Sequence, residues 1–123
     1  MKFGTAITCI DCRVQEPVTS WLKARYYLDY VDMVTEAGAD AVMASGARED
    51  IARLQRNVQR SIERHGSTVI ALVGHDDCAA NPGTKEQHAA QLAAGLHTIR
   101  LWNFSASVLA LWVNEAWEVE IVA

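Results

Sequence analysis

Hydrophobic positions along the chain follow two different spacings, which predict helices and strands in alternation. The clearest helical pattern covers Arg48–His65, where apolar residues recur every three or four positions among arginines and glutamates. Gly66 follows this segment, as is typical of the residue just past a helix C-terminus. Thr68–Val73 is instead apolar without polar alternation, which is typical of a central parallel strand buried on both faces.

The remaining segments extend this alternation. Strand patterns occur in Phe3–Ile10, Tyr30–Thr35, Ile99–Phe104, Val108–Val113 and Trp117–Val122, and helical ones in Pro17–Tyr27 and from Thr84 to about Leu96. Strands alternating with helices predict an α/β fold, here a single domain over residues 1–123 with a mostly parallel sheet flanked by helices. The turn-like residues 114–116 predict an antiparallel hairpin at the C-terminus.

Composition narrows the classes of function. Half of the 123 residues are apolar, which suits one globular core. The formal net charge of -4, with dispersed Lys and Arg, argues against a nucleic-acid partner. No run approaches the ~20 apolar residues needed to cross a bilayer, and Met1–Thr5 does not resemble the start of a secretory signal. We therefore expect a cytoplasmic protein without membrane partners, whose three cysteines are reduced thiols or metal ligands.

Two short motifs far apart in the sequence carry the most reactive side chains. Residues 9–13 (CIDCR) follow the first predicted strand, and residues 75–78 (HDDC) follow the predicted central strand. Because ligands of open α/β sheets bind beyond the carboxyl ends of the strands, the two motifs are expected to meet. Thiolate and imidazole are good ligands of Zn²⁺, and three protein ligands leave a fourth position for water. Cys9, His75 and Cys78 are therefore candidate zinc ligands.

Cys12 leaves other arrangements open. Cys9, Cys12, His75 and Cys78 together would make a closed structural site with four protein ligands. Along an extended strand, however, Cys9 and Cys12 point to opposite faces, so joint ligation needs a turn right after Cys9. The simpler interpretation of Cys12 is a small buried side chain. A thiol redox pair of Cys9 and Cys12 would leave the second motif unexplained.

The spacings Cys9-x-Asp11-x-Arg13 and His75-x-x-Cys78 resemble the paired zinc motifs of the β-class carbonic anhydrases, and the similarity extends to about residue 80. The resemblance implies a zinc ion held by the two cysteines and the histidine, with Asp11 and Arg13 as a catalytic pair beside it. In that family a hydroxide on zinc attacks carbon dioxide to give bicarbonate, and the aspartate can replace water on the metal. An ordinary ion pair that shapes the loop is the alternative for Asp11 and Arg13.

One segment departs from the family pattern. Where catalytic members usually read Arg-Asn-Ala-Gly, residues 35–38 read Thr-Glu-Ala-Gly, so a basic residue and an amide are missing. Related proteins act on carbonyl sulfide or carbon disulfide, which leaves the substrate open. We expect a carbonic anhydrase-like lyase that hydrates carbon dioxide, or an enzyme that hydrolyses a related small heterocumulene. A non-catalytic relative with a structural zinc is the alternative.

Association with further copies of the chain is also expected. Val108–Val113 is almost wholly apolar and needs a surface to cover it. The resemblance also implies a pocket at a subunit boundary. We expect a homodimer or a larger homo-oligomer that takes carbon dioxide, bicarbonate or an analogue as its small-molecule partner.

Other polar and aromatic residues receive simpler interpretations. Asp76 and Asp77 could tune the site as hydrogen-bond acceptors, but the simpler expectation is that they are solvated loop acids. The remaining histidines, expected at the surface or at helix ends, are His65, His88 and His97. The C-terminal tryptophans, expected in core or interface packing, are Trp102, Trp112 and Trp117.

Overall fold

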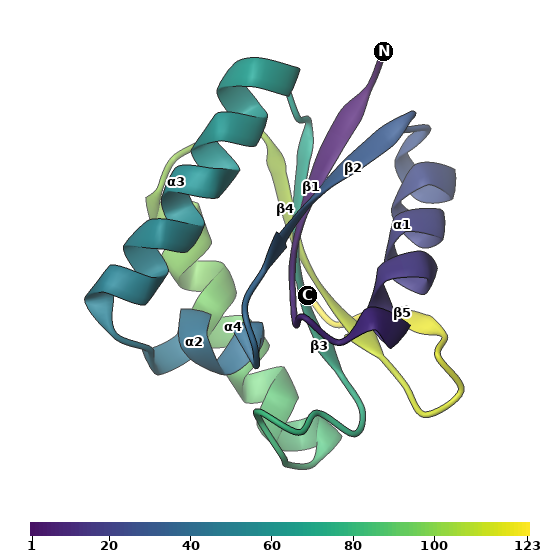
Figure 1. The fold of residues 1–123 in the computed structure, drawn as a ribbon, viewed down its shortest axis with the longest axis vertical. Helices are drawn as coiled ribbons and strands as arrows, with labels where there is room; N and C mark the ends of the chain where they lie inside the picture. Colours follow the sequence, from purple (N-terminus) through teal and green to yellow (C-terminus); the bar gives the residue numbers. More distant parts are fainter.

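Strands and helices alternate along the chain in the computed structural model, which describes residues 1–123. In chain order the elements are β1 (Phe3–Thr8), α1 (Cys12–Tyr26), β2 (Tyr30–Thr35), α2 (Ala39–Ser45), α3 (Arg48–His65), β3 (Val69–His75), α4 (Lys85–Leu101), β4 (Ser107–Val113) and β5 (Val119–Ile121). The strands form one sheet in the order β2-β1-β3-β4-β5 (Figure 1). The first four are parallel, and β5 pairs antiparallel with β4. The expected α/β fold and its C-terminal hairpin are confirmed.

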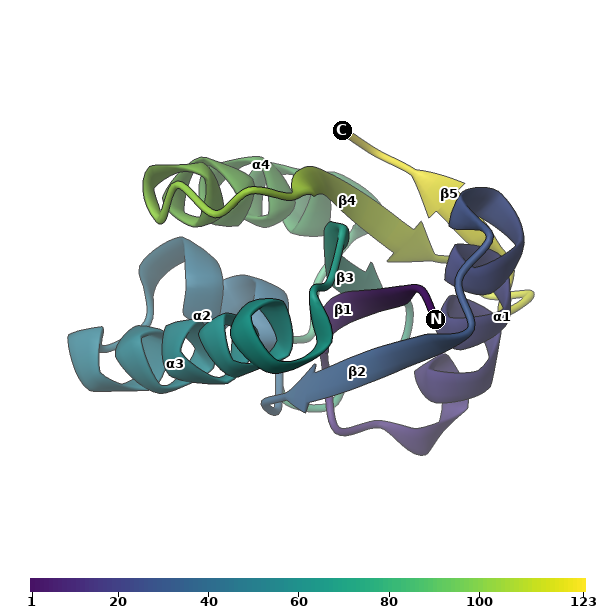
Figure 2. The ribbon, with the colours of Figure 1, turned by 90° about the horizontal axis from the view of Figure 1, so that it is seen from above.

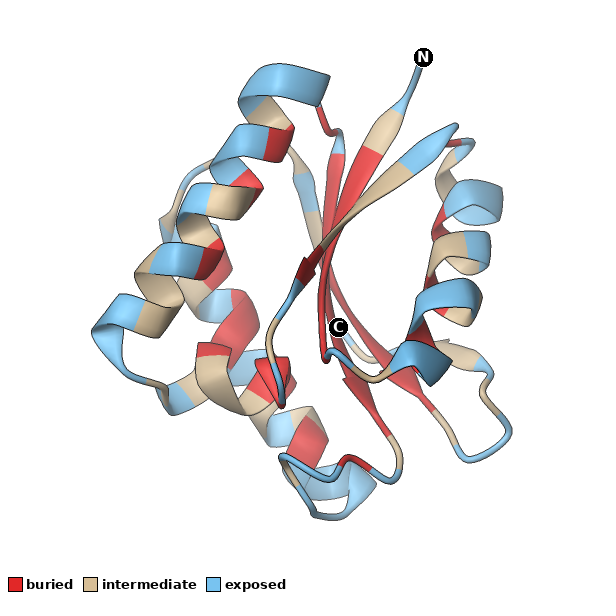
Figure 3. Cartoon of the chain, in the orientation of Figure 1, coloured by how far each residue is buried: buried red, intermediate tan, exposed pale blue.

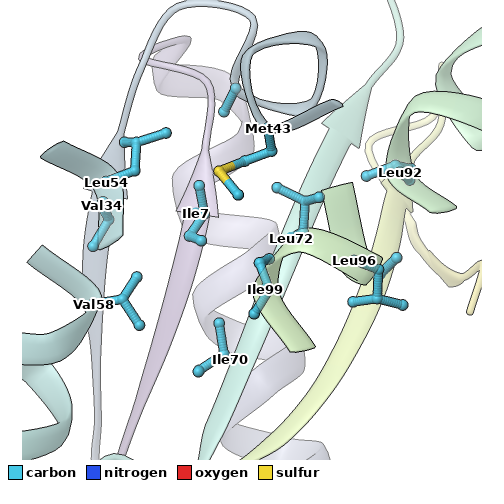
Figure 4. Packing of buried hydrophobic residues seen from close by; sticks show 12 residues of the cluster. Ile7, Val34, Met43, Leu54, Val58, Ile70, Leu72, Leu92, Leu96 and Ile99 are labelled. Carbon is cyan, nitrogen blue, oxygen red and sulfur yellow. The ribbon is translucent and has the colours of Figure 1, made fainter. Parts of the chain in front are cut away.

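Helices cover both faces of this sheet (Figure 2). α2, α3 and α4 lie against one face, and α1 lies against the other, beside β5. The central strand β3 contributes to both layers, because Ile70 and Leu72 belong to the first core cluster while Val69, Ala71 and Val73 belong to the second. Figure 4 shows the first cluster between the sheet and its three helices. An apolar segment without polar alternation is thus explained by burial on both faces.

β4 does not need a second copy of the chain to cover it. Leu109–Val113 is buried, with β3 on one side of the strand and β5 on the other. Figure 3 shows the buried residues concentrated along the central strands, with exposed ones on the outer sides of the helices. The apolar character of this segment therefore reflects its place in the sheet, and it gives no support to a homodimer.

The structure also corrects several predicted elements. Ile99–Phe104 is not a strand, because α4 continues to Leu101. Ile99 is buried on the same side of this helix as Leu92 and Leu96, at the spacing that a helix requires. Two further corrections concern helices. α1 begins at Cys12, before the expected start at Pro17, and the short helix α2 was not expected. The boundaries of β2 and α3 agree with the prediction. None of the helices combines the length and the apolar character needed to cross a membrane.

Candidate metal centre

The order of the strands brings the two sequence motifs together. From β1 the chain crosses to β2 on one side, and from β2 it returns past β1 to β3, so β1 and β3 are hydrogen-bonded neighbours. The chain therefore leaves β1 toward one edge of the sheet and β3 toward the other edge. In α/β sheets, the crevice at the carboxyl ends of two such strands is where ligands bind. Cys9 directly follows β1, His75 is the last residue of β3, and Cys78 lies in the loop that follows it.

Cys9, His75 and Cys78 form a compact group of possible metal ligands. One ligand atom from each residue lies within 4.8 Å of the others. All three residues are buried, with exposed fractions of 6%, 2% and 5%. Two sulfurs bonded to one tetrahedral zinc ion at about 2.3 Å lie roughly 3.8 Å apart. The observed distance between Cys9 Sγ and Cys78 Sγ is 3.9 Å, so the sulfurs fit a shared metal and are too far apart for a disulfide.

The hydrogen bonding of His75 also favours a ligand role. Its Nδ1 lies 2.7 Å from the carbonyl oxygen of Asp76, which can only accept a hydrogen bond. Nδ1 therefore donates, and a neutral imidazole then has its lone pair on Nε2. Nε2 is the one buried side-chain nitrogen or oxygen atom with no hydrogen-bond partner. A buried polar atom without a partner is costly, and a metal ion would remove that cost.

The environment of the two thiols is consistent with this interpretation. Burial raises the pKa of the Cys78 thiol, and the neighbouring Cys9 adds to the effect. Backbone N–H groups of Asn81 and Ala80 oppose the rise in this pKa. The backbone N–H of Gly38 donates to Cys9 Sγ at 3.5 Å. Two buried thiolates at this distance would repel each other, and a divalent cation would offset their charge.

Asp11 and Arg13 lie together at the start of α1. Asp11 caps the helix, because its Oδ1 accepts a hydrogen bond from the backbone N–H of Arg13 at 3.0 Å. The Arg13 side chain donates to the same carboxylate from Nε at 3.0 Å and from Nη2 at 2.7 Å. This pairing lowers the pKa of Asp11 to about 2. The carboxylate is thus ionised at neutral pH and held by Arg13.

Arg13 has two further neighbours that the sequence interpretation missed. Arg13 Nη1 donates to the carboxylate of Asp77 at 3.2 Å, and Arg13 Nη2 donates to the backbone carbonyl of Asp77, also at 3.2 Å. The Arg13 Cζ atom lies 4.5 Å from the centroid of the Trp117 ring. Asp77 is therefore not merely a solvated acid, and Trp117 does more than pack in the core. Neither contact had a sequence signal, because both cross between separate elements.

A pocket of about 310 Å³ opens beside Cys9 and Asp11. Its lining residues are Cys9, Ile10, Asp11, Cys12, Ala37, Ala79 and Ala80. All of them except Asp11 are apolar or weakly polar, so the pocket suits a small uncharged molecule. Within residues 35–38, where the sequence departs from the family pattern, Ala37 lines this pocket and Glu36 forms an ion pair with Arg53 of α3.

Cys12 lies outside the ligand group. It is exposed, contrary to the expectation of a buried side chain, because it begins α1 instead of continuing β1. It also does not belong to the compact group, which disfavours the closed site of four protein ligands.

Replacing Cys12 by serine is therefore expected to leave metal binding unchanged. The Cys12→Ser variant should bind one zinc per chain with an affinity within about 3-fold of the parent protein, because no ligand is lost. Competition with a chromophoric chelator measures this affinity. A drop of more than about 100-fold would instead show that Cys12 completes the ligand set.

His88 was expected at the surface or at a helix end. It lies near the start of α4 but is buried, against Asp40 of α2. The exposed fractions of His88 and Asp40 are 1% and 2%. His88 Nδ1 forms a hydrogen bond with the Asp40 carboxylate, and Asn81 Nδ2 donates to the same carboxylate at 2.9 Å. A Cβ atom on Gly74 would lie 2.5 Å from Asp40 Oδ2, so a larger residue beside His75 would push this carboxylate aside. The network connects Asn81, in the loop that carries Cys78, to α2 and α4.

Comparisons with known proteins agree with this geometry. A family model described as "Putative carbonic anhydrase" matches residues 1–123. The β-carbonic anhydrase isoform I of Trichomonas vaginalis is similar in structure, with a TM-score of 0.58 and 14% identity over 96% of this chain and 81% of that chain. A structure from work on two tetrameric β-carbonic anhydrases of Sordaria macrospora has a TM-score of 0.51 and 12% identity over 98% of this chain and 79% of that chain. No curated protein matches significantly. At these identities the structural likeness establishes the fold alone.

Proposed function

Because this chain belongs to the "Putative carbonic anhydrase" family, we propose that it hydrates carbon dioxide with a zinc ion bound by Cys9, His75 and Cys78. The observation that carries the proposal is the buried group of Cys9, His75 and Cys78, whose ligand atoms lie within 4.8 Å of one another. Within it, His75 Nε2 has no hydrogen-bond partner. The β-class resemblance of the sequence agrees with this family and fold. Zinc bound there would supply Lewis acidity, which lowers the pKa of a coordinated water.

Asp11 and Arg13 have distinct roles in this proposal. Asp11 lines the pocket beside Cys9 and is ionised, so it can accept a hydrogen bond from a water molecule in the pocket. Arg13 donates to the carboxylate from two side-chain nitrogens, Nε and Nη2, which keeps the carboxylate oriented and disfavours its protonation. The loop acid Asp77 competes for the same guanidinium, but it is more exposed, with side-chain fractions of 76% against 19% for Asp11.

The pocket supports a small apolar substrate. Ile10, Ala37, Ala79 and Ala80 present hydrocarbon surface around the single carboxylate. Carbon dioxide and related heterocumulenes are small, linear and uncharged, so they gain little from charged side chains and fit such a lining. The missing basic residue and amide in residues 35–38 leave carbonyl sulfide and carbon disulfide as competing substrates.

Association of several copies is also part of this proposal. Ile10 is 61% exposed at the rim of the pocket, where a second copy would cover it. The Sordaria macrospora enzymes of similar fold are described as tetrameric.

Substitution of Asp11 by asparagine is expected to lower carbon dioxide hydration about 100-fold. Asparagine still caps a helix, so stability should change little, while the negative charge opposite Arg13 is lost. Stopped-flow hydration from about pH 6.5 to 9.5 on protein of measured zinc content tests this, and the parent activity should rise with pH because two thiolates weaken the acidification of water.

Asp50→Asn is the matched control, because Asp50 is a partly exposed acid that pairs with Arg53 on α3. It should retain the parent rate. Zinc-loaded parent protein without hydration activity would contradict the proposal. It would favour either another heterocumulene, to be assayed on carbonyl sulfide and carbon disulfide, or the alternative of a structural metal.

A further inference from the structure

Strained backbone positions gather around Arg13. The non-glycine residues with positive φ are Tyr27, Asp77, Asn103 and Trp117. Asp77 and Trp117, with φ of 55° and 60°, are the two of these that contact the Arg13 guanidinium. Positive φ is costly for a bulky side chain, and such positions persist where the surrounding structure holds them and cluster at functional sites. The strain at Trp117 therefore calls for an explanation beyond a tight turn.

The turn between β4 and β5 holds Trp117 in this conformation. The backbone N–H of Trp117 donates to the carbonyl of Asn114 at 2.9 Å. Asn114 Oδ1 accepts hydrogen bonds from the backbone N–H groups of Ala116 and Glu118, both at 3.0 Å. The turn is also attached to the loop after His75, because the backbone N–H of Asp76 donates to the carbonyl of Val113 at 2.9 Å. Trp117 is thus fixed relative to the candidate ligands.

The indole ring lies close to a residue of each motif. It lies under the Arg13 guanidinium at 4.5 Å, and its centroid is 6.3 Å from that of the His75 ring. The Arg13 side chain is 44% exposed, so water and Asp77 compete with Asp11 for its donors. An aromatic face attracts a guanidinium and covers one side of it. In this position Nε and Nη2 of Arg13 donate to Asp11 at 3.0 Å and 2.7 Å.

We propose that Trp117 is a positioning residue, which holds the Arg13 guanidinium against Asp11 through its ring and accepts backbone strain to do so. The inference rests on the proposed role of Asp11 and Arg13 in carbon dioxide hydration. Trp117 itself touches neither substrate nor the reacting atoms in this scheme. It acts by favouring the arrangement of the guanidinium in which Nε and Nη2 donate to Asp11 while Nη1 reaches Asp77.

Three variants of the zinc-loaded protein separate positioning from folding. Trp117→Gly removes the ring and relaxes the positive φ, because glycine adopts this conformation without strain. Trp117→Phe keeps an aromatic face and should partly restore the contact. Tyr27→Gly is the matched control, since Tyr27 also has positive φ, at 55°, and is an aromatic residue that is 82% exposed. It caps the far end of α1, away from Arg13.

The readout that does not depend on activity is hydrogen exchange of the Arg13 Nε–H, followed by NMR. In Trp117→Gly this exchange should be about 3- to 30-fold faster than in the parent protein, the range that corresponds to a cation–π contact. The hydration kcat should fall by a similar factor with KM little changed. Trp117→Phe should lie between the parent and Trp117→Gly, and Tyr27→Gly should match the parent in both measurements.

Equal exchange rates in Trp117→Gly and Tyr27→Gly would overturn the inference. If Trp117→Gly fails to fold, the same comparison between Trp117→Phe and Tyr27→Gly decides it. Because the exchange measurement needs no turnover, an inactive parent protein with slow Arg13 exchange would refute the proposed function while leaving the positioning by Trp117 intact.

Discussion

Replacing His75 by alanine is expected to lower zinc affinity by well over 100-fold, since loss of a residue that merely orients a ligand already costs 10- to 100-fold. The reason lies in the site: His75 Nε2 is buried without another partner, and Nδ1 is held by the Asp76 carbonyl. The parent protein should unfold at a higher temperature when zinc is added, because a ligand that binds only the folded state stabilises it. His75→Ala should show almost no such rise.

The matched control for this experiment is His97→Ala. His97 is an exposed histidine of α4 that does not belong to the ligand group. Chelator competition and thermal unfolding with and without zinc should give parent values for this variant. A parent-like rise in unfolding temperature for His75→Ala would contradict the assignment of His75 as a ligand.

Replacing Asp40 by alanine is expected to lower the free energy of unfolding by about 2–4 kcal/mol, because each buried group left without its hydrogen-bond acceptor costs about 1–3 kcal/mol. The substitution leaves His88 and the Asn81 amide facing a cavity without their shared acceptor. This is a large part of the stability of a small domain, typically about 5–15 kcal/mol. Asn81 lies near Cys78, so zinc affinity should also fall about 10- to 100-fold.

Asp32→Ala provides the comparison for Asp40→Ala. Asp32 also pairs with a histidine, His65, at 2.7 Å, but the two side chains are 32% and 44% exposed. A partly exposed pair contributes about 1 kcal/mol or less. The candidate metal ligands lie on other elements than Asp32 and His65. Urea unfolding measures both variants. Equal losses of stability would show that burial of the Asp40 and His88 pair has no special importance.

The prediction of the fold succeeded where local pattern and final environment agree. Arg48–His65 shows a helical spacing and forms α3 over these residues, and the central apolar segment forms β3 with both faces covered. Ile99–Phe104 failed because a short apolar run has no unambiguous period, and packing against Leu92 and Leu96 continued the helix. α2 was missed because a helix of 7 residues depends on its packing more than on its sequence.

At the candidate site, the meeting of Cys9, His75 and Cys78 could be inferred from sequence, because parallel strands have their carboxyl ends at one edge of a sheet. The sequence also indicated Asp11 and Arg13, since they are two residues apart and interact locally. Metal binding by Cys9, His75 and Cys78, and catalysis by Asp11 and Arg13, stay predictions.

The sequence by itself determined the family, the α/β class and the two motifs, because these depend on residue types and short spacings. Only the tertiary structure decided that Cys12 is exposed, that Asp40 meets His88, and that Trp117 covers Arg13. These contacts join residues of separate helices, strands and loops. Short-range patterns carry no information about such pairs, because which side chains meet is decided only when the elements pack.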